Sequence, residues 1–456
     1  MKKVGIIGTG YVGLTHGAVL AEKGNRVICY DINSEKVEQL KKGSMPIYEP
    51  GLEELVTKNY KEKRISFTND PLECIHNSDI LFICVNTPPK QTSGGLRKAD
   101  LSYVENAAKM IAQNMIGYKL VVDKSTVPVM TGEKVYETMV KSNTPCEFDV
   151  VSNPEFLREG KAVEDAMKPD RIVIGVMRDK EGKLLKRPLK KMRELYKDFD
   201  TQIIETDIWS AELIKLASNA YLANQISFIN KIAELCKITG ADVCEVAKGM
   251  KLDKRIGNYA FLNAGIGFGG SCFPKDIESL YNILLENNIN PEFFKQILEV
   301  NKAQKYFFLK MIEEGLWTIR DKKIAVLGVS FKPDTDDMRE APSIEIINKL
   351  YDEGAKIKIY DPKAIREAEK HFGNKIVYCK SLEEAVIGTD ATLLLTEWEE
   401  FKKMNLKKIK KLMKEPSYFF DGRNVFNPQK MSKLGFYYYS VGRPHIKPNT
   451  LKNEKK

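Results

Sequence analysis

The sequence is poor in the residues from which metal sites are built. It contains four histidines and eight cysteines among 456 residues. No two cysteines form a C-x-x-C pair, and no histidine has the spacing of a metal ligand, so no metal site is predicted. Several cysteines lie inside apolar runs, as Cys84 does within residues 80–85. Reduced core thiols are expected there, and the pattern indicates a reducing, cytoplasmic compartment.

Long apolar runs are also missing. No stretch of about 20 apolar residues occurs, so no membrane span is predicted. A hydrophobic content of 43% and a charged content of 29% are typical of a soluble globular protein. The length suggests about three domains.

The net charge of +10 comes largely from short lysine runs and a lysine-rich tail. Between the runs, Phe401, Met404, Ile409 and Leu412 recur at spacings that suit an amphipathic helix. A nucleic-acid surface is one reading of this charge, but no recognised nucleic-acid module accompanies it. A solvated helix face, or a field that attracts small anions, is the preferred interpretation. No nucleic-acid or membrane partner is predicted.

Strand-like and helix-like segments alternate through the first part of the chain. Apolar runs at residues 4–7, 27–30, 80–85 and 120–122 are separated by helical patterns, and residues 150–151 and 172–176 add later strands. This alternation predicts a doubly wound parallel sheet of the Rossmann type.

The pattern changes in the middle of the chain and then restarts. Residues 208–238 show helical spacing without proline or glycine, which predicts one long central helix. Residues 322–328 repeat the opening motif, and strand patterns follow at 356–360 and 391–396. We predict an α/β chain with two Rossmann-like domains, residues 1–200 and 316–445. A helical middle domain at 201–315 joins them, and a flexible tail occupies 446–456.

A glycine pattern follows the first strand. Gly8, Gly10 and Gly13 form G-x-G-x-x-G between a strand and a helix, and Asp31 ends the next strand. Such glycines let the backbone approach a pyrophosphate at a helix N-terminus. An aspartate at that position binds ribose hydroxyls and repels a 2′-phosphate, so the sequence predicts NAD rather than NADP. The alternative is a glycine turn in another α/β fold.

The restart lacks this glycine pattern. It reads G-V-S-F-K at residues 328–332, with Lys332 in the loop. We therefore predict that the second Rossmann-like domain binds a different phosphate-containing ligand, a second nucleotide rather than a second NAD.

A glycine-rich segment at residues 265–276 ends in Cys272, Lys275 and Asp276. Such loops lose entropy on folding unless the backbone must approach a ligand. A cysteine just before a helical stretch and near a lysine is favoured as thiolate. The alternative is a packing cysteine beside a flexible loop.

Two further groups carry candidate polar residues. Lys215 and Asn219 are four apart, and therefore on one face of the predicted long helix, in apolar surroundings. Residues 153–160 place Glu155 and Glu159 in a turn before a helix.

Seven segments in this order resemble the UDP-glucose/GDP-mannose dehydrogenase family over nearly the whole chain. They are G-T-G-Y-V-G (8–13), V-N-T-P (85–88), S-T-V-P (125–128), N-P-E-F-L-R-E-G (153–160), K-L-A-S-N-A (215–220), G-F-G-G-S-C-F-P-K-D (267–276) and D-G-R-N (421–424). R-I-G-N (255–258), F-L-N-A-G (261–265) and T-E-W-E-E-F (396–401) are most similar to its UDP-glucose 6-dehydrogenase branch.

The resemblance implies an oxidation performed twice at one site, from the C6 alcohol of a nucleotide sugar to a carboxylate, with two NAD reduced. Cys272 would attack the C6 aldehyde to give a thiohemiacetal, whose oxidation yields a thioester. Lys215 and Asn219 would stabilise negative charge on the C6 oxygen. Asp276, helped by Thr126, would position water, and Glu155 is the alternative base for thioester hydrolysis.

The resemblance also implies the binding residues. Those expected at NAD are Gly8, Gly10, Tyr11, Val12, Gly13, Asp31, Lys36, Thr87, Thr126, Glu159, Lys275 and Arg339. Those expected at the sugar nucleotide are Glu155, Phe156, Leu157, Arg158, Lys215, Asn219, Tyr259, Phe268, Gly269, Phe331, Lys332 and Arg423. Arg255 would reach the sugar site of a partner subunit, which implies a homodimer or a higher homo-oligomer.

Other functions remain open at this point. A GDP-mannose 6-dehydrogenase, or an enzyme for another UDP-sugar, would share Cys272, Lys215 and Asn219. A two-electron hydroxyacid dehydrogenase would release a carbonyl product and need no cysteine. A non-catalytic sugar-nucleotide binder would show affinity without turnover.

Overall fold

The computed structural model describes residues 1–91, 96–144, 146–445 and 448. The chain packs into two compact units, one formed by residues 1–218 and 278–291 and the other by residues 219–277 and 292–456. Two helices, α9 (Ile208–Thr239) and α11 (Phe273–Glu286), contribute residues to both units. The single helix predicted at 208–238 is confirmed by α9. Apart from Pro448, the predicted tail at 446–456 lies outside the described residues.

The first unit is built on an eight-stranded sheet. In spatial order its strands are β10 (Gln202–Asp207), β9 (Arg171–Val176), β8 (Phe148–Ser152), β7 (Lys119–Asp123), β4 (Ile80–Ile83), β1 (Lys3–Ile7), β2 (Arg26–Tyr30) and β3 (Ile65–Thr68). Six of them, from β8 to β3, run parallel, whereas β9 pairs with β8 in the antiparallel sense and β10 runs parallel to β9. The predicted parallel Rossmann core is present, extended at one edge by two reversed strands.

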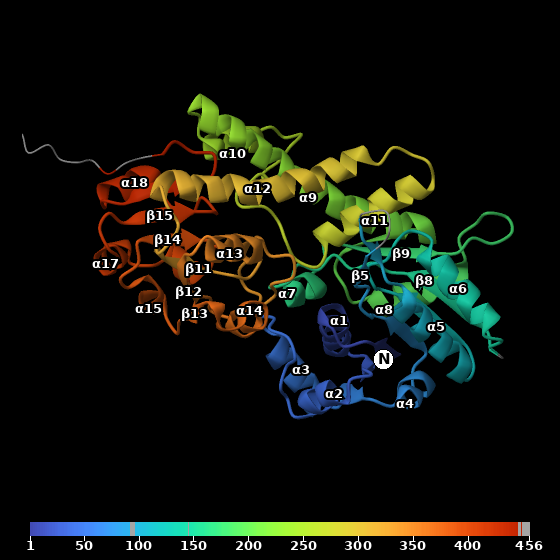
Figure 1. Cartoon of the computed structure of the whole chain (residues 1–456). Coiled ribbons are helices and arrows are strands. Elements are labelled where there is room, and N and C mark those ends of the chain that lie inside the picture. Colours follow the sequence, from blue (N-terminus) through green and yellow to red (C-terminus); the bar gives the residue numbers. More distant parts are fainter. Residues whose placement is uncertain (92–95, 145, 446–447, 449–456) are drawn as a thin grey trace, which may run out of the picture. The chain divides into compact units, whose positions relative to one another are not determined.

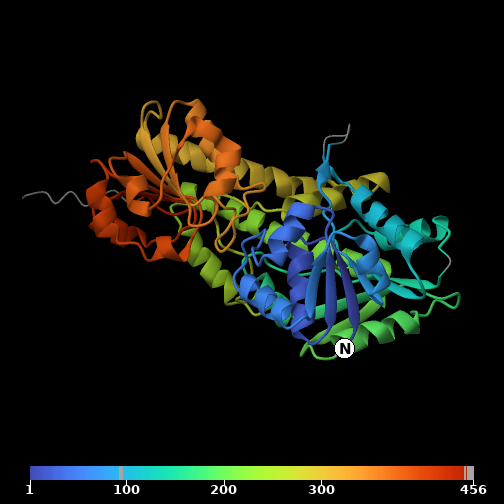
Figure 2. The same ribbon diagram turned by 90° about the horizontal axis from the view of Figure 1, so that it is seen from below.

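Helices cover both faces of this sheet, so alternate strand residues enter two different cores. In β4, Phe82 packs with α1 on one face while Leu81 and Ile83 pack with α5 on the other. A strand buried on both faces needs apolar residues at every position, which explains the continuous runs in the sequence. Figure 2 shows the first strands in blue, side by side between helices.

Among the residues that the structure describes, the remaining elements of the first unit are eight helices and a short ribbon. The helices are α1 (Tyr11–Glu22), α2 (Ser34–Lys41), α3 (Leu52–Lys61), α4 (Pro71–His76), α5 (Ser102–Asn114), α6 (Thr131–Lys141), α7 (Ala162–Met167) and α8 (Lys186–Tyr196). The ribbon pairs β5 (Pro89–Lys90) with β6 (Lys98–Ala99) in the antiparallel sense.

The second unit contains a six-stranded sheet in which all strands run parallel. In spatial order they are β13 (Val377–Tyr378), β12 (Lys356–Tyr360), β11 (Lys323–Leu327), β14 (Ala391–Leu394), β15 (Tyr418–Asp421) and β16 (Tyr437–Ser440). Figure 1 labels five of these strands in the orange and red part of the chain. The restart of the Rossmann pattern after residue 322 is therefore confirmed.

The helices of the second unit cover both faces of its sheet. They are α10 (Val243–Lys251), α12 (Glu292–Leu316), α13 (Pro342–Asp352), α14 (Ile365–Phe372), α15 (Leu382–Val386), α16 (Glu399–Lys402), α17 (Leu406–Leu412) and α18 (Pro428–Lys433), with a short 3₁₀ turn η1 (Gly373–Lys375). The helical pattern at 401–412 forms two helices instead of one, because Asn405 accepts a hydrogen bond from the Lys408 amide and caps a new helix. Phe401 and Ile409 are buried as that pattern requires.

No helix in the part of the chain that the structure describes is both long enough and apolar enough to cross a membrane.

Candidate active site

The three glycines of the first loop have different physical roles. Gly8 adopts φ +97°, and a Cβ there would lie 2.7 Å from the Cys84 carbonyl oxygen. A Cβ on Gly13 would lie 1.9 Å from the Gly8 carbonyl oxygen. At Gly10, in contrast, the only atom within 4 Å of a Cβ would be Asn86 Oδ1, at 3.7 Å. Packing of the protein itself requires Gly8 and Gly13, whereas Gly10 leaves open space beside the backbone.

That open space lies at the start of α1. Gly10 is the N-cap residue, no side chain caps the helix, and its first turn contains no acidic residue. The first amide groups of a helix are donors with no partner inside the helix, and the helix dipole favours an anion beside them. This end of α1 therefore fits a pyrophosphate.

Asp31 lies at the end of β2, next to this loop. Its carboxylate accepts hydrogen bonds from the Thr9 amide (2.9 Å), the Thr9 hydroxyl (2.6 Å) and the Asn33 amide (3.0 Å), and Lys36 Nζ lies 3.1 Å away. Burial by itself would raise the pKa of Asp31, but these hydrogen bonds and the Lys36 charge hold it below its ordinary value. The group at the ribose position is thus a carboxylate.

Two further predicted cofactor residues are joined by a hydrogen bond. Thr87 follows β4 and Thr126 follows β7, and the Thr87 hydroxyl donates to the Thr126 carbonyl oxygen at 2.9 Å. Parallel strands end at the same sheet edge, where ligands of Rossmann folds bind. Glu159 lies in a turn held by Glu49, whose carboxylate accepts from the Gly160 and Ala162 amides at 2.7 Å each.

A buried ion pair joins the turn after β8 to the central helix. Lys215 Nζ lies 2.9 Å from Glu155 Oε1, and both side chains are at most 6% exposed. Glu155 also accepts from the Leu157 amide (2.6 Å) and from the Thr126 hydroxyl (3.3 Å). Burial raises the pKa of Glu155. The charge and hydrogen bond of Lys215, together with the Leu157 amide and the charge of Lys124, outweigh burial and leave the pKa below its ordinary value.

Neighbours of Glu155 form a cationic and aromatic cluster. Phe156 has the Arg171 guanidinium 3.8 Å from its ring centroid and Lys215 Nζ 5.5 Å from it. Arg158 instead points to Asp165, which it binds through Nε at 2.9 Å. The first unit thus brings together Thr126, Glu155, Phe156 and Lys215.

The second unit assembles the predicted nucleophile and its neighbours around Asp276. Asp276 is fully buried, and its two carboxylate oxygens accept from Asn219 Nδ2 and Lys275 Nζ, both at 2.6 Å. Cys272 lies one residue before α11, and the Asp276 amide donates to its carbonyl oxygen at 2.9 Å. The Ser271 hydroxyl lies 3.5 Å from Cys272 Sγ. A thiol, a carboxylate, an ammonium and an amide are thereby held by one helical turn and one residue of α9.

The glycine-rich loop before Cys272 is shaped by packing within its own unit. Gly267 and Gly270 have φ +104° and +84°. A Cβ on Gly269 would lie 2.3 Å from the Glu340 carbonyl oxygen, and one on Gly270 would lie 2.8 Å from the Phe331 ring. The protein's own backbone and side chains therefore already require glycine at these positions. The approach of a ligand is not needed to explain them.

Three residues that the sequence analysis missed hold this loop. Asn301 accepts from the Phe268 amide (2.8 Å) and donates to its carbonyl oxygen (2.9 Å). Gln304 donates to the Gly265 carbonyl oxygen (2.7 Å), and Asn230 accepts from the Gly265 amide (2.9 Å). These polar residues lie on the long helices α12 and α9. Sequence spacing cannot distinguish them from solvated helix positions.

Arg423 connects the loops at the carboxyl ends of the second sheet. Its guanidinium donates to the carbonyl oxygens of Leu395 (2.7 Å), Gly267 (3.3 Å) and Phe331 (3.1 Å). Lys332 Nζ lies 5.4 Å from the Phe331 ring centroid. This edge therefore gathers cationic groups, which suits a phosphate ligand.

Asp361 occupies the place in the second sheet that Asp31 has in the first. Its carboxylate accepts from the Val329, Ser330 and Lys363 amides and from Trp398 Nε1, and the Trp398 side chain is itself buried. The sequence analysis did not single out this residue. The groups of the protein itself thus enclose the Asp361 carboxylate.

Three further residues of the predicted site have the following surroundings. The Arg255 side chain is 89% exposed and pairs with Asp253 at 2.6 Å. Tyr259 is 97% exposed. Arg339 pairs with Asp337, while its carbonyl oxygen accepts from the Gly270 amide at 2.8 Å.

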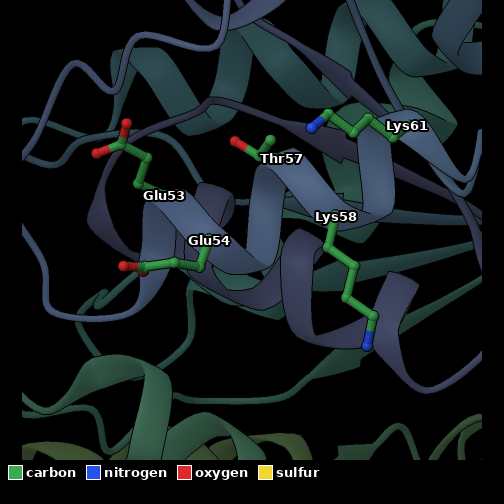
Figure 3. Close-up of a pocket in the computed structure, with 5 residues that line it drawn as sticks. All are labelled: Glu53, Glu54, Thr57, Lys58 and Lys61. Atoms are coloured by element: carbon green, nitrogen blue, oxygen red, sulfur yellow. The ribbon is translucent and has the colours of Figure 1, made fainter.

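A surface hollow lies elsewhere, along α3. It is lined by Glu53, Glu54, Thr57, Lys58 and Lys61, all from that one helix (Figure 3). None of the predicted site residues lines it, and its mixed charges include no nucleophile. The chemistry-bearing residues lie around Glu155 and Asp276 instead. No group of histidine, cysteine or acidic residues suited to a metal occurs among residues 1–91, 96–144, 146–445 and 448.

Comparison with known proteins gives a consistent assignment. Residues 2–200, 209–303 and 325–428 match the NAD binding, central and UDP binding domains of the UDP-glucose/GDP-mannose dehydrogenase family. The UDP-glucose 6-dehydrogenase TuaD of Bacillus subtilis is 46% identical over 448 residues, 98% of this chain and 94% of that protein. The UDP-glucose 6-dehydrogenase of Rhizobium meliloti is 43% identical over 443 residues, 97% of this chain and all of that protein.

A solved structure shows the same relationship. A UDP-glucose dehydrogenase from the hyperthermophilic archaeon Pyrobaculum islandicum superposes with a TM-score of 0.89 at 35% identity, covering 97% of this chain and 98% of that one. The sequence motifs, the two Rossmann-like sheets and these matches lead to one conclusion. The chain belongs to the UDP-glucose/GDP-mannose dehydrogenase family.

Proposed function

We propose that this chain oxidises UDP-glucose to UDP-glucuronate in two steps through a covalent adduct on Cys272. The chain is an NAD-dependent dehydrogenase, as its family domains and relatives show. The proposal adds the sugar, the covalent route and the role of each residue. The observation that carries it is the cluster in which Asn219, Lys275 and Asp276 meet at the helical turn that follows Cys272.

NAD fits the first unit on two grounds. The start of α1 offers uncapped amide groups beside open space at Gly10, and Asp31 supplies a carboxylate for ribose hydroxyls. When bound, NAD accepts the hydride in each oxidation. We assign the cofactor contacts to Gly8, Gly10, Tyr11, Val12, Gly13, Asp31, Lys36, Thr87, Thr126, Glu159, Lys275 and Arg339.

The first oxidation turns the C6 alcohol into an aldehyde by loss of a proton and a hydride. Developing negative charge on the C6 oxygen is stabilised by Lys215 and Asn219, which lie one turn apart on α9. Lys215 is buried and pairs with the Glu155 carboxylate at 2.9 Å, and an ammonium group held in this way suits this task.

The second oxidation proceeds on Cys272. Its thiolate adds to C6, a C–S bond forms, and the former carbonyl oxygen receives a proton. Loss of that proton and of a second hydride gives a thioester. Attack of water at C6 then breaks the C–S bond and releases the carboxylate and the thiolate. Asp276, one turn after Cys272, positions the water in this proposal, and Glu155 with Thr126 is the alternative.

The substrate assignment favours UDP-glucose over GDP-mannose or another UDP-sugar. Relatives that are UDP-glucose 6-dehydrogenases align with nearly the whole chain at 40–46% identity. We also propose the three-part division into residues 1–200, 201–315 and 316–445. The sugar nucleotide is then held by Glu155, Phe156, Leu157, Arg158, Lys215, Asn219, Arg255, Tyr259, Phe268, Gly269, Phe331, Lys332 and Arg423.

The proposal is tested by the NADH yield per sugar nucleotide consumed, with UDP-glucose and GDP-mannose assayed side by side. Two NADH per UDP-glucose are expected, because two hydrides leave C6, and GDP-mannose should be inert. One NADH per UDP-glucose would mean that the reaction stops at the carbonyl and that the covalent route is wrong. Turnover of GDP-mannose in preference to UDP-glucose would overturn the substrate assignment.

A homodimer completes the proposal, and α9 carries the surface for it. Tyr221, Phe228 and Leu235 recur every seven residues on this helix and are 63%, 47% and 55% exposed. Such an apolar stripe is typical of a surface that another helix covers. A second copy of the chain is the proposed occupant, with Arg255 and Tyr259 available to the partner's substrate.

Phe228→Asp should therefore convert the dimer to monomers in analytical ultracentrifugation, and Arg255→Ala should raise the KM for UDP-glucose. Tyr103→Asp is the matched control, since Tyr103 is an aromatic residue with similar exposure (51%) on α5 in the first unit. A wild-type protein that sediments as a monomer would contradict the dimer, and an unchanged KM for Arg255→Ala would contradict the shared site.

The proposed compartment is the cytoplasm. All eight cysteines lie within the described residues and form no disulfide there, which supports a reducing compartment.

A further inference from the structure

Lys124 is a buried lysine to which the reaction above assigns no role. It is the residue immediately after β7, and the residue as a whole is 6% exposed. Its Nζ donates to the Asn153 carbonyl oxygen at 3.2 Å and to Asn153 Oδ1 at 3.0 Å. Burying an ammonium group is costly unless it is paired or hydrogen-bonded, so a lysine here requires an explanation.

The contacts of Asn153 fix the start of the turn that carries Glu155. Asn153 Oδ1 also accepts from the Tyr196 hydroxyl at 2.5 Å, and its Nδ2 donates to the Val173 carbonyl oxygen at 2.7 Å. The backbone amide of Asn153 donates to the Asp123 carbonyl oxygen at 2.8 Å. Only Pro154 separates Asn153 from Glu155. Because these hydrogen bonds hold Asn153 in place, they also restrict the position of Glu155.

His16 extends this network toward the cofactor loop. It lies on α1, and its Nε2 is 3.3 Å from the Tyr196 hydroxyl. Burial, followed by the charge of Lys124, lowers the pKa of His16 well below its ordinary value, so the ring is neutral. Since the Tyr196 hydroxyl hydrogen goes to Asn153, His16 Nε2 is the donor to Tyr196. Lys124 is thus the cation of the network.

Lys124 acts electrostatically on the Glu155–Lys215 pair. Burial lowers the pKa of Lys124 to about 8. The negative charge of Glu155 opposes this shift, and the positive charge of Lys215 adds to it. Lys124 also helps to lower the pKa of Glu155. The titratable groups around Lys124 come from three strands and three helices, or from the residues that directly follow them. They are Cys84, Asp123 and Glu155 at β4, β7 and β8, and Lys215, His16 and Tyr196 on α9, α1 and α8.

We infer that Lys124 is a positioning residue that holds the Asn153–Glu155 turn and supplies the second positive charge that keeps Glu155 ionised. It acts through Glu155 and has no assigned contact with the substrate. The inference rests on the proposed function, since it assigns Lys124 a task in the step that uses Glu155 and Lys215. Two neighbouring ammonium groups favour the charged form of the Glu155 carboxylate.

The pH profile of kcat tests the inference in a set of variants. Lys124→Gln can still donate to Asn153 but has no charge. Without that charge the pKa of Glu155 rises, so the acid limb of the profile should move to higher pH. Lys124→Arg restores the charge and should return the acid limb toward the wild-type position.

Lys119→Gln is the matched control. Lys119 is also buried (3% exposed), lies at the other end of β7 and donates to the Ser78 carbonyl oxygen. Its replacement removes a buried ammonium from the same strand but should leave the acid limb in place. An acid limb that stays at its wild-type pH in Lys124→Gln, or that moves equally in Lys119→Gln, would overturn the inference.

A second measurement does not depend on turnover. Thermal unfolding of Lys124→Gln, Glu155→Gln and the double variant forms a double-mutant cycle. A favourable coupling between the two residues is expected, and additive effects would overturn the inference. Failure of the proposed function would be detected by different results. These are one NADH per UDP-glucose, or an acid limb that stays at its wild-type pH in Glu155→Gln. The cycle still measures the coupling of Lys124 to Glu155 in either case.

Discussion

Cys272→Ser is expected to lower the four-electron turnover of UDP-glucose by roughly 10³-fold or more, as losses of catalytic nucleophiles do. A serine hydroxyl ionises far less readily than a cysteine thiol and is the weaker nucleophile, so the covalent adduct forms poorly. Initial rates of NADH formation give the loss. Quantification of aldehyde and acid products shows which oxidation is blocked.

Cys146→Ser provides the control for this substitution. Cys146, like Cys272, is partly exposed and forms no disulfide, but its Sγ accepts from the Gly117 amide at 3.1 Å and it belongs to the first unit. This variant should turn over at nearly the wild-type rate. If Cys272→Ser also kept a near wild-type rate with two NADH per sugar, the covalent route through Cys272 would have to be abandoned.

Lys215→Met is expected to reduce both activity and stability. The variant loses a group that stabilises charge on the C6 oxygen, which should lower kcat by about 10²–10³-fold. It also leaves Glu155 buried without its cation, and breaking one side of a buried ion pair costs about 3–5 kcal/mol. Steady-state kinetics and urea unfolding measure the two effects on one protein.

An exposed ion pair supplies the control for stability. Lys141 and Glu137 lie 3.0 Å apart on α6 with side chains 75% and 53% exposed. Lys141→Met should change the free energy of unfolding by less than about 1 kcal/mol, because such pairs are solvated and screened. Equal losses of stability in the two variants would show that the Lys215–Glu155 pair is not the buried interaction described above.

The same pair gives the stability of the wild-type protein a pH dependence of defined sign. The folded protein holds the pKa of Glu155 below its ordinary value, so Glu155 releases its proton more readily when folded. Its contribution is complete above the pKa of an unfolded glutamate, about 4.3, and is lost as the pH falls through the lower folded value. The stability difference between wild type and Lys215→Met should shrink over that acidic range.

Local patterns determined a large part of this protein. Apolar runs in β1 and β4, helical spacing along α9 and the glycines before α1 depend on interactions between near neighbours or on burial of whole strands. These features led directly to the two Rossmann-like sheets and to the long central helix. The grouped motifs around Glu155, Asn219 and Cys272 led to the family, which the comparisons then established.

Tertiary contacts decided what no spacing in the sequence reveals. The reversal of β9 depends on which edge of the sheet remains open, and the break between α16 and α17 depends on a cap at Asn405. Asn301 is recognised as a support for the Phe268 backbone only when α12 is folded beside that loop. Lys124 becomes a buried cation only when Asn153, 29 residues further along the chain, surrounds it with acceptors. The sequence shows residue types and local periodicity directly. The partners of a buried polar group, in contrast, come from distant segments that only folding brings together.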